Sequence, residues 1–231
     1  MEEKYNKKYY KFNKQDQDRL GNLFYSNVIK NNFKFKNYLD FGCGVGFLLK
    51  RLEKKNKINT YGYEINDFAI NKCLQNTKNS KIYKNLDNIR EKFDLISMLH
   101  IVEHIDSEDL KKLFTKLKNK LNQNGKILIS TPAKNGLAHR LKKKEWIGYK
   151  DSTHINLKSY AEWKFFFESI NLKIINKSND GLWDFPYKTA LLNFKYIKII
   201  FLMVFQIFFG SLFLNHDDGE TLILILEHNA Y

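Results

Sequence analysis

The chain has 231 residues, of which 43% are hydrophobic and 15% are aromatic. These values are typical of a globular protein, and they exclude a largely disordered chain. The length is enough for one α/β domain with a full core, but it is too short for two independent enzymatic domains. We therefore expect a single domain over residues 1–231.

The formal net charge of +14 raises the question of nucleic-acid binding, because clustered lysines and arginines neutralise phosphates. Arginine occurs only at Arg19, Arg51, Arg90 and Arg140, so nearly all of the positive charge comes from lysines that are spread along the chain. Net charge of this kind favours non-specific attraction more than one particular function. A general surface charge therefore explains it better than a dedicated groove, and RNA is the second choice as a partner.

The cysteines and the N-terminus bear on the compartment. Cys43 and Cys73 are too few for a disulfide framework, and neither belongs to a CxxC pair. The first residues, Met-Glu-Glu-Lys-Tyr-Asn-Lys-Lys, lack the apolar core of a secretory signal. We therefore expect a cytoplasmic protein.

The first part of the chain predicts alternating strands and helices. Apolar residues at helical spacing from Asp16 to Lys30 predict a helix within an N-terminal cap over residues 1–36. Short apolar runs then alternate with helical stretches, as in a doubly wound parallel sheet. The expected strands cover residues 38–41, 60–63, 81–83, 93–98 and 126–131, and the expected helices cover 45–55, 67–75 and 107–121.

The alternation stops after residue 131. Residues 132–157 contain Pro132, Gly136 and Gly148 without a clear period, which predicts an irregular excursion on the acceptor side of the sheet. A capping box of Ser159 and Glu162 then begins an aromatic helix that extends to residue 169. Residues 172–176 and 221–226 predict two further strands.

An apolar insertion at residues 187–215 separates these last two strands. Its segment 197–214 is nearly long enough to span a bilayer. A span is disfavoured because one crossing would place the last strand on the wrong side of the membrane. Three interpretations stay open: a helix that covers the sheet edge, a homodimer contact, or a peripheral membrane contact through residues 194–214, with Lys188, Lys195 and Lys198 near anionic headgroups.

The segment Tyr38-Leu-Asp-Phe-Gly-Cys-Gly-Val-Gly46 carries the most information about function. An apolar strand leads here into a turn with glycines at positions 42, 44 and 46, which allow a tight bend and the close approach of a ligand at a helix N-terminus. The second strand ends at Glu64, whose carboxylate can accept hydrogen bonds from both hydroxyls of a ribose. Together these residues predict a nucleoside site.

Four segments resemble, in order, the motifs of class I S-adenosylmethionine-dependent methyltransferases. Residues 39–46 resemble the first motif, 61–64 the second, 93–105 the fourth-strand motif and 124–132 the strand-five motif. The resemblance returns at residues 220–227 as the final strand. It implies a Rossmann-like α/β fold with a seven-stranded, mostly parallel sheet, an antiparallel last strand, helices on both faces, and an apolar helical insertion before that last strand.

The resemblance also implies S-adenosylmethionine as the cofactor. The glycine turn would hold its methionine part, Glu64 the ribose, and Leu86 with Asp87 the adenine, while Met98 to His100 would close the pocket near the reacting methyl group. The expected cofactor residues are Asp40, Phe41, Gly42, Cys43, Gly44, Gly46, Glu64, Ile65, Leu86, Asp87, Met98 and Leu99.

A second group of residues follows the fourth strand. His100, Glu103 and His104 are close enough in the chain for one helical turn to bring them to one side, and His154 lies in the excursion that should fold back over them. Imidazoles and a carboxylate suit a divalent cation, and an imidazole can also act as a general base toward a hydroxyl. Two roles stay open: a metal site of all four residues, or catalysis by His104 and His154.

This pattern is similar to the E-x-x-E-H and distant histidine of ubiquinone-pathway O-methyltransferases and of small-RNA 2′-O-methyltransferases. That resemblance implies a metal that orients the acceptor oxygen. The chain departs from the pattern at His100, where those families carry the first glutamate, and a nitrogen ligand favours a transition metal over magnesium.

We therefore expect a methyltransferase that acts on a hydroxyl of a small-molecule or lipid-linked acceptor, such as a glycan-pathway sugar or a quinone precursor. The first alternative is an RNA 2′-O-methyltransferase with a metal-assisted site. The second is a protein that binds S-adenosylmethionine without catalysis.

Overall fold

Within the described residues, 16–54, 57–184, 187 and 194–228, the computed structural model contains one seven-stranded sheet with the order β3-β2-β1-β4-β5-β7-β6. The strands are β1 (Asn37–Phe41), β2 (Asn59–Tyr63), β3 (Lys81–Tyr83), β4 (Phe93–Leu99), β5 (Leu121–Pro132), β6 (Leu172–Asn179) and β7 (Thr221–His228). β7 runs antiparallel to both neighbours, whereas the other neighbouring pairs are parallel. This confirms the predicted Rossmann-like sheet with an antiparallel last strand.

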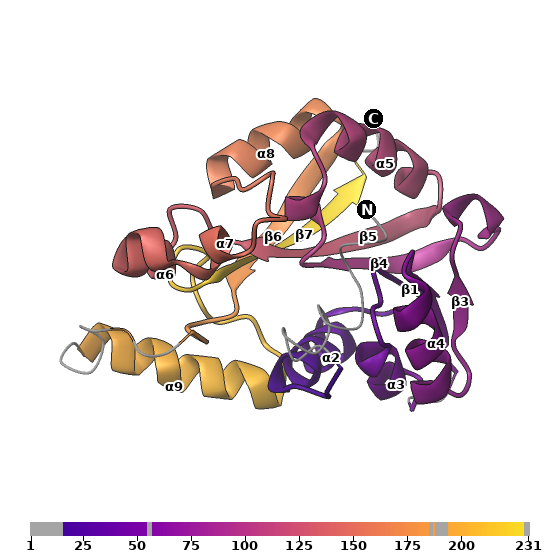
Figure 1. Ribbon diagram of the computed structural model, residues 1–231, viewed down its shortest axis with the longest axis horizontal. Coiled ribbons are helices and arrows are strands. Elements are labelled where there is room, and N and C mark those ends of the chain that lie inside the picture. The colour runs from indigo at the N-terminus through magenta and orange to yellow at the C-terminus, as the bar shows by residue number, and fades with distance from the viewer. Residues whose placement is uncertain (1–15, 55–56, 185–186, 188–193, 229–231) are drawn as a thin grey trace.

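Helices cover both faces of the sheet (Figure 1). One face carries α5 (Ser107–Lys118) and α8 (Tyr160–Ser169), and the other carries α2 (Leu20–Asn32), α3 (Phe47–Leu52), α4 (Asp67–Asn76) and α9 (Phe194–Phe209). An apolar cluster fills the space between sheet and helices on each side. The central strands are therefore buried on both faces, which explains why they read as nearly continuous apolar runs.

The order of the strands indicates where a ligand is expected to bind. The chain leaves β1 toward β2 on one side and reaches β4 on the other side. In open α/β sheets, ligands bind outside the carboxyl ends of the strands at such a reversal. The segments that follow β1 and β4 are the glycine turn and the turn that contains His100 to His104.

Several predicted elements differ from the structure at their ends. α2 begins at Leu20, four residues after the predicted start, and residues 1–15 of the predicted cap lie outside the described residues. α3 begins only at Phe47, because Gly46 before it has a left-handed backbone. β5 begins at Leu121 rather than Lys126, because Leu121 pairs with β4 across an irregularity in the register.

The excursion at 132–157 contains more regular structure than its composition predicts. It forms α6 (Leu137–Lys142), the 3₁₀ turn η4 (Lys143–Glu145) and α7 (Ile147–Lys150). Trp146 is fully buried and packs against His139 and Tyr149. Tertiary packing around this tryptophan stabilises helices that are too short to show a sequence period.

The helix predicted in the apolar insertion is α9. Three asparagines of α2 donate to the carbonyl groups at and just after its C-terminal end: Asn27 to Ile207, Asn31 to Phe209 and Asn32 to Gly210, over 2.6–2.8 Å. These bonds satisfy carbonyl groups that a helix end leaves without an internal partner. Residues 188–193 of the insertion lie outside the described residues. In the described part of the chain, no helix combines the length and the apolar character that crossing a bilayer requires.

Candidate cofactor and acceptor site

The glycine turn after β1 has a backbone that only glycine adopts readily. Gly42, Gly44 and Gly46 have φ angles of 81°, 53° and 84°. A Cβ atom at Gly42 would lie 2.2 Å from Cδ1 of Ile101, and one at Gly46 would lie 2.4 Å from Sγ of Cys73. The turn is thus packed tightly against the segment after β4 on one side and against α4 on the other.

Glu64 holds this turn in place. Its Oε2 accepts a hydrogen bond from the backbone N–H of Gly44 at 2.9 Å, and its Oε1 accepts from Ile65 and Asn66 at 2.8 and 2.9 Å. Burial raises the pKa of Glu64, and the three N–H donors partly offset this effect. The carboxylate that was predicted to hold the ribose therefore also fixes the glycine turn.

Asp40 is a second buried carboxylate at the start of the turn. The register of β1 and β4 places it opposite Ser97, whose hydroxyl donates to Oδ1 at 2.6 Å. The Ser97 oxygen lies 2.6 Å from the hydroxyl of Tyr38. Burial raises the pKa of Asp40 to about 6, against the lowering effect of these hydroxyls. Asp40 therefore changes charge just below neutral pH.

An aromatic pair joins the ends of β1 and β2, where the predicted cofactor residues Phe41 and Glu64 lie. Tyr63 stacks on Phe41, with ring centroids 4.4 Å apart. Burial, followed by the charges of Glu64 and Asp87, raises the pKa of Tyr63. Asp87 is exposed and pairs with Lys116 at 3.1 Å.

Two further predicted cofactor residues, Leu86 and Met98, are buried. Leu86 is buried in η2 (Leu86–Asn88), just before Asp87. Met98 is fully buried in the core, and the prediction that the region from Met98 to His100 closes the pocket stays a prediction. Its neighbour Leu99 is partly buried against the opposite cluster. The alternation of side chains along a strand explains why adjacent residues of β4 point to opposite faces.

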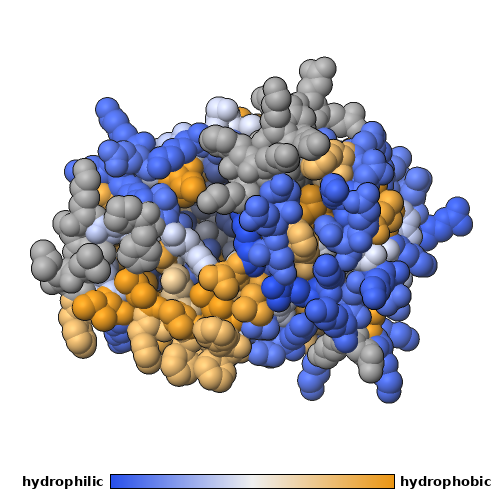
Figure 2. All heavy atoms as spheres, turned by 60° about the horizontal axis from the view of Figure 1, so that its bottom comes forward, coloured by the Kyte–Doolittle hydropathy of each residue, from blue (hydrophilic) through white to orange (hydrophobic). Residues whose placement is uncertain are grey.

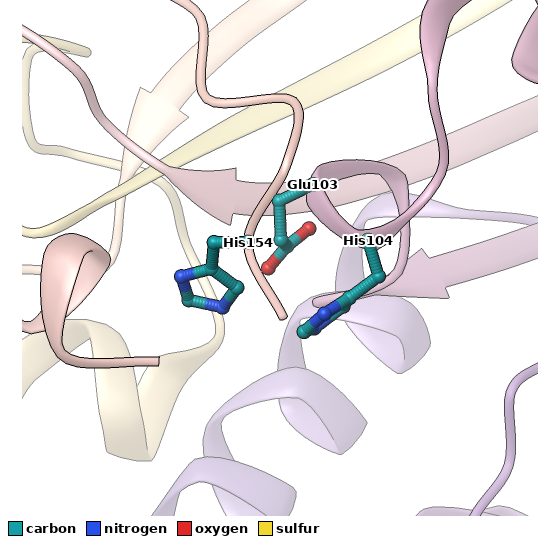
Figure 3. Close-up of side chains that lie close together, drawn as sticks. All are labelled: Glu103, His104 and His154. Atoms are coloured by element: carbon teal, nitrogen blue, oxygen red, sulfur yellow. The ribbon is translucent and has the colours of Figure 1, made fainter. Parts of the chain in front are cut away.

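Three of the four residues predicted for the second site come together (Figure 3). Glu103 and His104 lie in η3 (Val102–His104), and His154 comes from the excursion. One ligand atom from each lies within 4.8 Å of the others. The backbone N–H groups of Ile155 and Asn156 both donate to the carbonyl of Glu103 at 3.0 Å, which ties the excursion to η3.

A chain of hydrogen bonds orients His104. The hydroxyl of Thr153 donates to Oδ1 of Asp151 at 2.5 Å, and its oxygen lies 2.9 Å from Nδ1 of His104. Because that hydroxyl proton points to Asp151, Nδ1 of His104 acts as the donor, and the lone pair of the neutral ring is on Nε2. Burial lowers the pKa of His104, against the raising effect of Glu103, so the ring is neutral at neutral pH.

Glu103 is fully buried, and among the described residues Nδ1 of His100 lies 3.3 Å from its Oε1, at a geometry that leaves both carboxylate oxygens without a well-formed hydrogen bond. Burial by itself raises the pKa of Glu103, but His100 and His104 outweigh it and lower that pKa. A buried carboxylate of this kind is costly unless a charge or a cation compensates it.

His100 is not part of the three-residue group, although its Nδ1 lies 3.3 Å from Oε1 of Glu103. It has a left-handed backbone with φ of 57°, which is uncommon for a residue with a side chain. Its Nε2 lies 3.4 Å from the hydroxyl of Ser130, which is 2.6 Å from the hydroxyl of Tyr25. Such strained residues cluster at functional sites.

Comparison with known proteins decides the family. A family model described as a methyltransferase domain matches residues 8–177, which is more than half of the chain. The chain belongs to this methyltransferase family. The methyltransferase has no match among curated proteins. Its finer resemblance to ubiquinone-pathway enzymes stays a prediction.

Solved structures share the fold of this methyltransferase at low sequence identity. An S-adenosylmethionine-dependent methyltransferase from Clostridium acetobutylicum is 17% identical, with a TM-score of 0.62 over 99% of both chains. A plantazolicin methyltransferase, in complex with a triazolic desmethyl analogue and S-adenosylhomocysteine, is 13% identical, with a TM-score of 0.66 over 97% of this chain and 92% of its own. A mitomycin 7-O-methyltransferase is 11% identical, with a TM-score of 0.59 over 90% of this chain and 54% of its own.

The residues of the methyltransferase fit the cofactor that its family implies. S-adenosylmethionine carries positive charge on its sulfonium and ammonium groups, and two buried carboxylates, Asp40 and Glu64, lie at the glycine turn. Glu64 accepts three hydrogen bonds, and a carboxylate offers about four acceptor positions, so it retains capacity for a ribose hydroxyl. A side chain at Gly42 or Gly46 would clash with residues that already pack there.

Several residues of the candidate site could not be recognised from the local sequence. Thr153 bonds His104 from 49 positions away, and Tyr25 reaches Ser130 across 105 positions. Tyr63, by contrast, lies directly before Glu64, so the second motif itself could have indicated it. Contacts between distant segments depend on the fold and cannot be read from local spacing.

Proposed function

We propose that this methyltransferase methylates a hydroxyl group of a small-molecule or lipid-linked acceptor, with His104 as the general base. The observation that supports this best is the chain from Asp151 through Thr153 to His104, which keeps a neutral imidazole oriented at the carboxyl edge of the sheet. Ile101, three residues before His104, packs against Gly42 of the glycine turn. The donor turn and the base are therefore neighbours.

Methyl transfer to a hydroxyl requires that the methyl donor and the acceptor oxygen are aligned, and that the hydroxyl proton is removed. Bound S-adenosylmethionine supplies a methyl group that the sulfonium already activates. Glu64 and the glycine turn orient the donor, and the excursion at 151–156 encloses the acceptor side. Nε2 of His104 would accept the hydroxyl proton as the acceptor oxygen takes the methyl group, the sulfur–methyl bond would break to leave S-adenosylhomocysteine, and Asp151 through Thr153 would stabilise the resulting imidazolium.

A divalent metal is the second candidate role for the same residues, and the buried oxygens of Glu103 favour it. Glu103, His104 and His154 offer one carboxylate and two imidazoles, a set that suits a transition metal better than magnesium. Nδ1 of His154 lies 2.8 Å from the carbonyl of Gly148, so its Nε2 carries the lone pair that a metal requires. Titration of the metal-free protein with Mn²⁺ or Zn²⁺ tests this role, and no binding heat would remove it.

The nature of the acceptor is supported by two observations. Among the similar structures, a plantazolicin methyltransferase is in complex with a triazolic desmethyl analogue, and another protein is named a mitomycin 7-O-methyltransferase. The apolar helix α9 favours an acceptor with a lipid part.

The two free, buried cysteines suit the expected cytoplasmic location.

The deciding experiment uses labelled S-adenosylmethionine and a cell extract that is separated into lipid, nucleic-acid and soluble fractions. We expect label in the lipid or the soluble fraction, and none with His104→Ala. Label confined to RNA would replace the proposed acceptor with a ribose 2′-hydroxyl. Cofactor binding without transfer to any fraction would indicate a binding protein.

A further inference from the structure

One side of α9 presents large apolar side chains to the solvent. We call this set the α9 face, and it consists of Phe194, Ile197, Phe201, Val204, Phe205, Phe208 and Phe209. These residues recur every three or four positions, so they lie along one side of the helix. Figure 2 shows them as a hydrophobic area that follows α9. Such a continuous patch is larger than scattered surface residues and indicates an interaction surface.

The opposite side of α9 holds the helix on the protein. Ile199, Gln206 and Ile207 are buried there. The amide group of Gln206 donates to the carbonyl of Asn179 at 3.0 Å and accepts from the backbone N–H groups of Phe213 and Leu214 at 2.6 and 2.8 Å. The helix is therefore already fixed without the α9 face, and the folded core does not account for its exposed phenylalanines.

The stretches of sequence that contain α9 and the neighbouring helix α2 carry charge of one sign. The sequence contains no Asp or Glu from residue 185 to residue 216, and none from residue 19 to residue 36, which includes the neighbouring helix α2. The same stretches contain seven cationic residues: Arg19, Lys30, Lys34, Lys36, Lys188, Lys195 and Lys198. Lys198 is exposed beside the face, whereas Lys188 and the side chain of Lys195 lie outside the described residues.

We propose that the α9 face docks on an anionic lipid surface. An amphipathic helix with exposed phenylalanines and flanking lysines binds in the plane of the interface, where the apolar side chains enter the lipid and the cations contact the headgroups. A second copy of the chain is a poorer partner, because two such faces would bring like charges together without acidic residues to compensate them. At 16 residues, α9 is too short to span the bilayer.

This docking would bring the acceptor site close to the membrane. Ile199 and Tyr196 of α9 share an apolar cluster with Leu137 and Trp146 of the excursion that closes the site. In Figure 1, α9 and α6 both extend beyond the carboxyl end of β5. A lipid-linked acceptor is therefore the substrate class that this geometry favours; that consequence rests on the proposed function, whereas the docking itself does not.

The test is flotation of the full-length protein with vesicles of phosphatidylglycerol and phosphatidylcholine, compared with vesicles of phosphatidylcholine alone. We expect the protein to float with the anionic vesicles, and the double variant Phe201→Ser and Phe208→Ser to lose roughly tenfold or more in binding. These side chains are 61% and 66% exposed, so the variant should fold. The matched control is Phe165→Ser on α8, where the side chain is 76% exposed on another part of the surface.

Two further measurements make the result decisive. Melting temperature and S-adenosylhomocysteine binding should match between the double variant and the wild type, which separates lipid docking from folding and from the proposed function. Wild-type protein that stays with the buffer, or a double variant that floats equally well, overturns the proposal. Light scattering that shows a dimer, lost in the double variant, together with no vesicle binding, would assign the α9 face to a second copy.

Discussion

We expect the carboxylate of Glu64 to take part in two interactions, one with the backbone of the glycine turn and one with the ribose of the donor. It accepts three backbone hydrogen bonds that shape the glycine turn, and its remaining capacity is what a ribose hydroxyl requires. A glutamine at this position is nearly isosteric, but its amide nitrogen cannot accept a hydrogen bond. We therefore expect the side chain of Glu64 to link the shape of the turn to the affinity for the donor.

We expect Glu64→Gln to weaken S-adenosylhomocysteine binding by roughly tenfold to a hundredfold, because one charged acceptor is lost at the turn and toward the ribose. Isothermal calorimetry measures this change. Asp67→Asn is the matched control, since Asp67 is an exposed carboxylate three residues away that pairs with Lys84. Unchanged affinity in a folded Glu64→Gln variant would separate Glu64 from the cofactor.

His104 should impose a rising pH profile on the rate. A general base works only when it is deprotonated, so kcat/KM should increase with pH through the pKa of His104 and then become constant. Because that pKa is lowered, the midpoint of the rise should lie below the ordinary histidine value of 6.5. Rates at saturating cofactor, measured from pH 5 to pH 8, check this.

Thr153→Val should lower kcat by roughly tenfold and leave cofactor affinity unchanged, because Nδ1 of His104 loses its link to Asp151 and keeps only the backbone carbonyl of Thr153 at 3.3 Å. Ser152→Ala next to it is a control that leaves this hydrogen bond in place. Equal activity of Thr153→Val and the wild type would count against the Asp151–Thr153–His104 chain.

Among the elements, the junctions around the insertion carry an unusual pair of buried acids. Asp180 follows β6, and Glu220 precedes β7. Oε1 of Glu220 accepts from the backbone of Trp183 and Asp184 at 3.0 and 2.5 Å, and the hydroxyl of Tyr187 also donates to it. Burial raises the pKa of Glu220 to about 7, and burial with the nearby Glu220 charge raises that of Asp180.

This junction should lose stability as the pH rises. The folded state holds a proton on Glu220 up to about pH 7, whereas the unfolded chain releases it near 4.5, so the free energy of unfolding falls between these two values. The shift corresponds to roughly 3 kcal/mol. Urea unfolding at pH 5 and pH 8 should show a smaller difference for Glu220→Gln than for the wild type. An equal difference in both proteins would show that another group dominates.

For the whole molecule, local sequence patterns were sufficient to predict the sheet and the helices that cover its two faces. Strands β1 and β4 read as mostly apolar runs because they are buried, and the glycine turn and Glu64 lie within one short β-α-β unit. α6 and α7 could not be predicted, because packing around Trp146 rather than any periodicity forms them. The group of Glu103, His104 and His154 was predictable only in outline, since hydrogen bonds between distant segments join its two halves.

The complete fold should respond to its ligand as one unit. A ligand that binds only the folded state stabilises it by about 2.7 kcal/mol at a hundredfold excess over its Kd, which corresponds to a rise in melting temperature of roughly 5 to 10 °C for a chain of this size. S-adenosylhomocysteine should produce this rise, and Glu64→Gln should reduce it. Scanning fluorimetry provides the measurement, and an unchanged wild-type melting curve would contradict the cofactor assignment.

Cys43 lies within the glycine turn, and its sulfur is 3.9 Å from that of Cys73 in α4. Both thiols are buried, and their mutual hydrogen bond, followed by burial, raises the pKa of Cys43. Since only a thiolate reacts readily, alkylating reagents should reach these sulfurs only in molecules whose turn has transiently opened. The rate of alkylation therefore reports how often the glycine turn opens. A ligand bound at this turn should lower that rate.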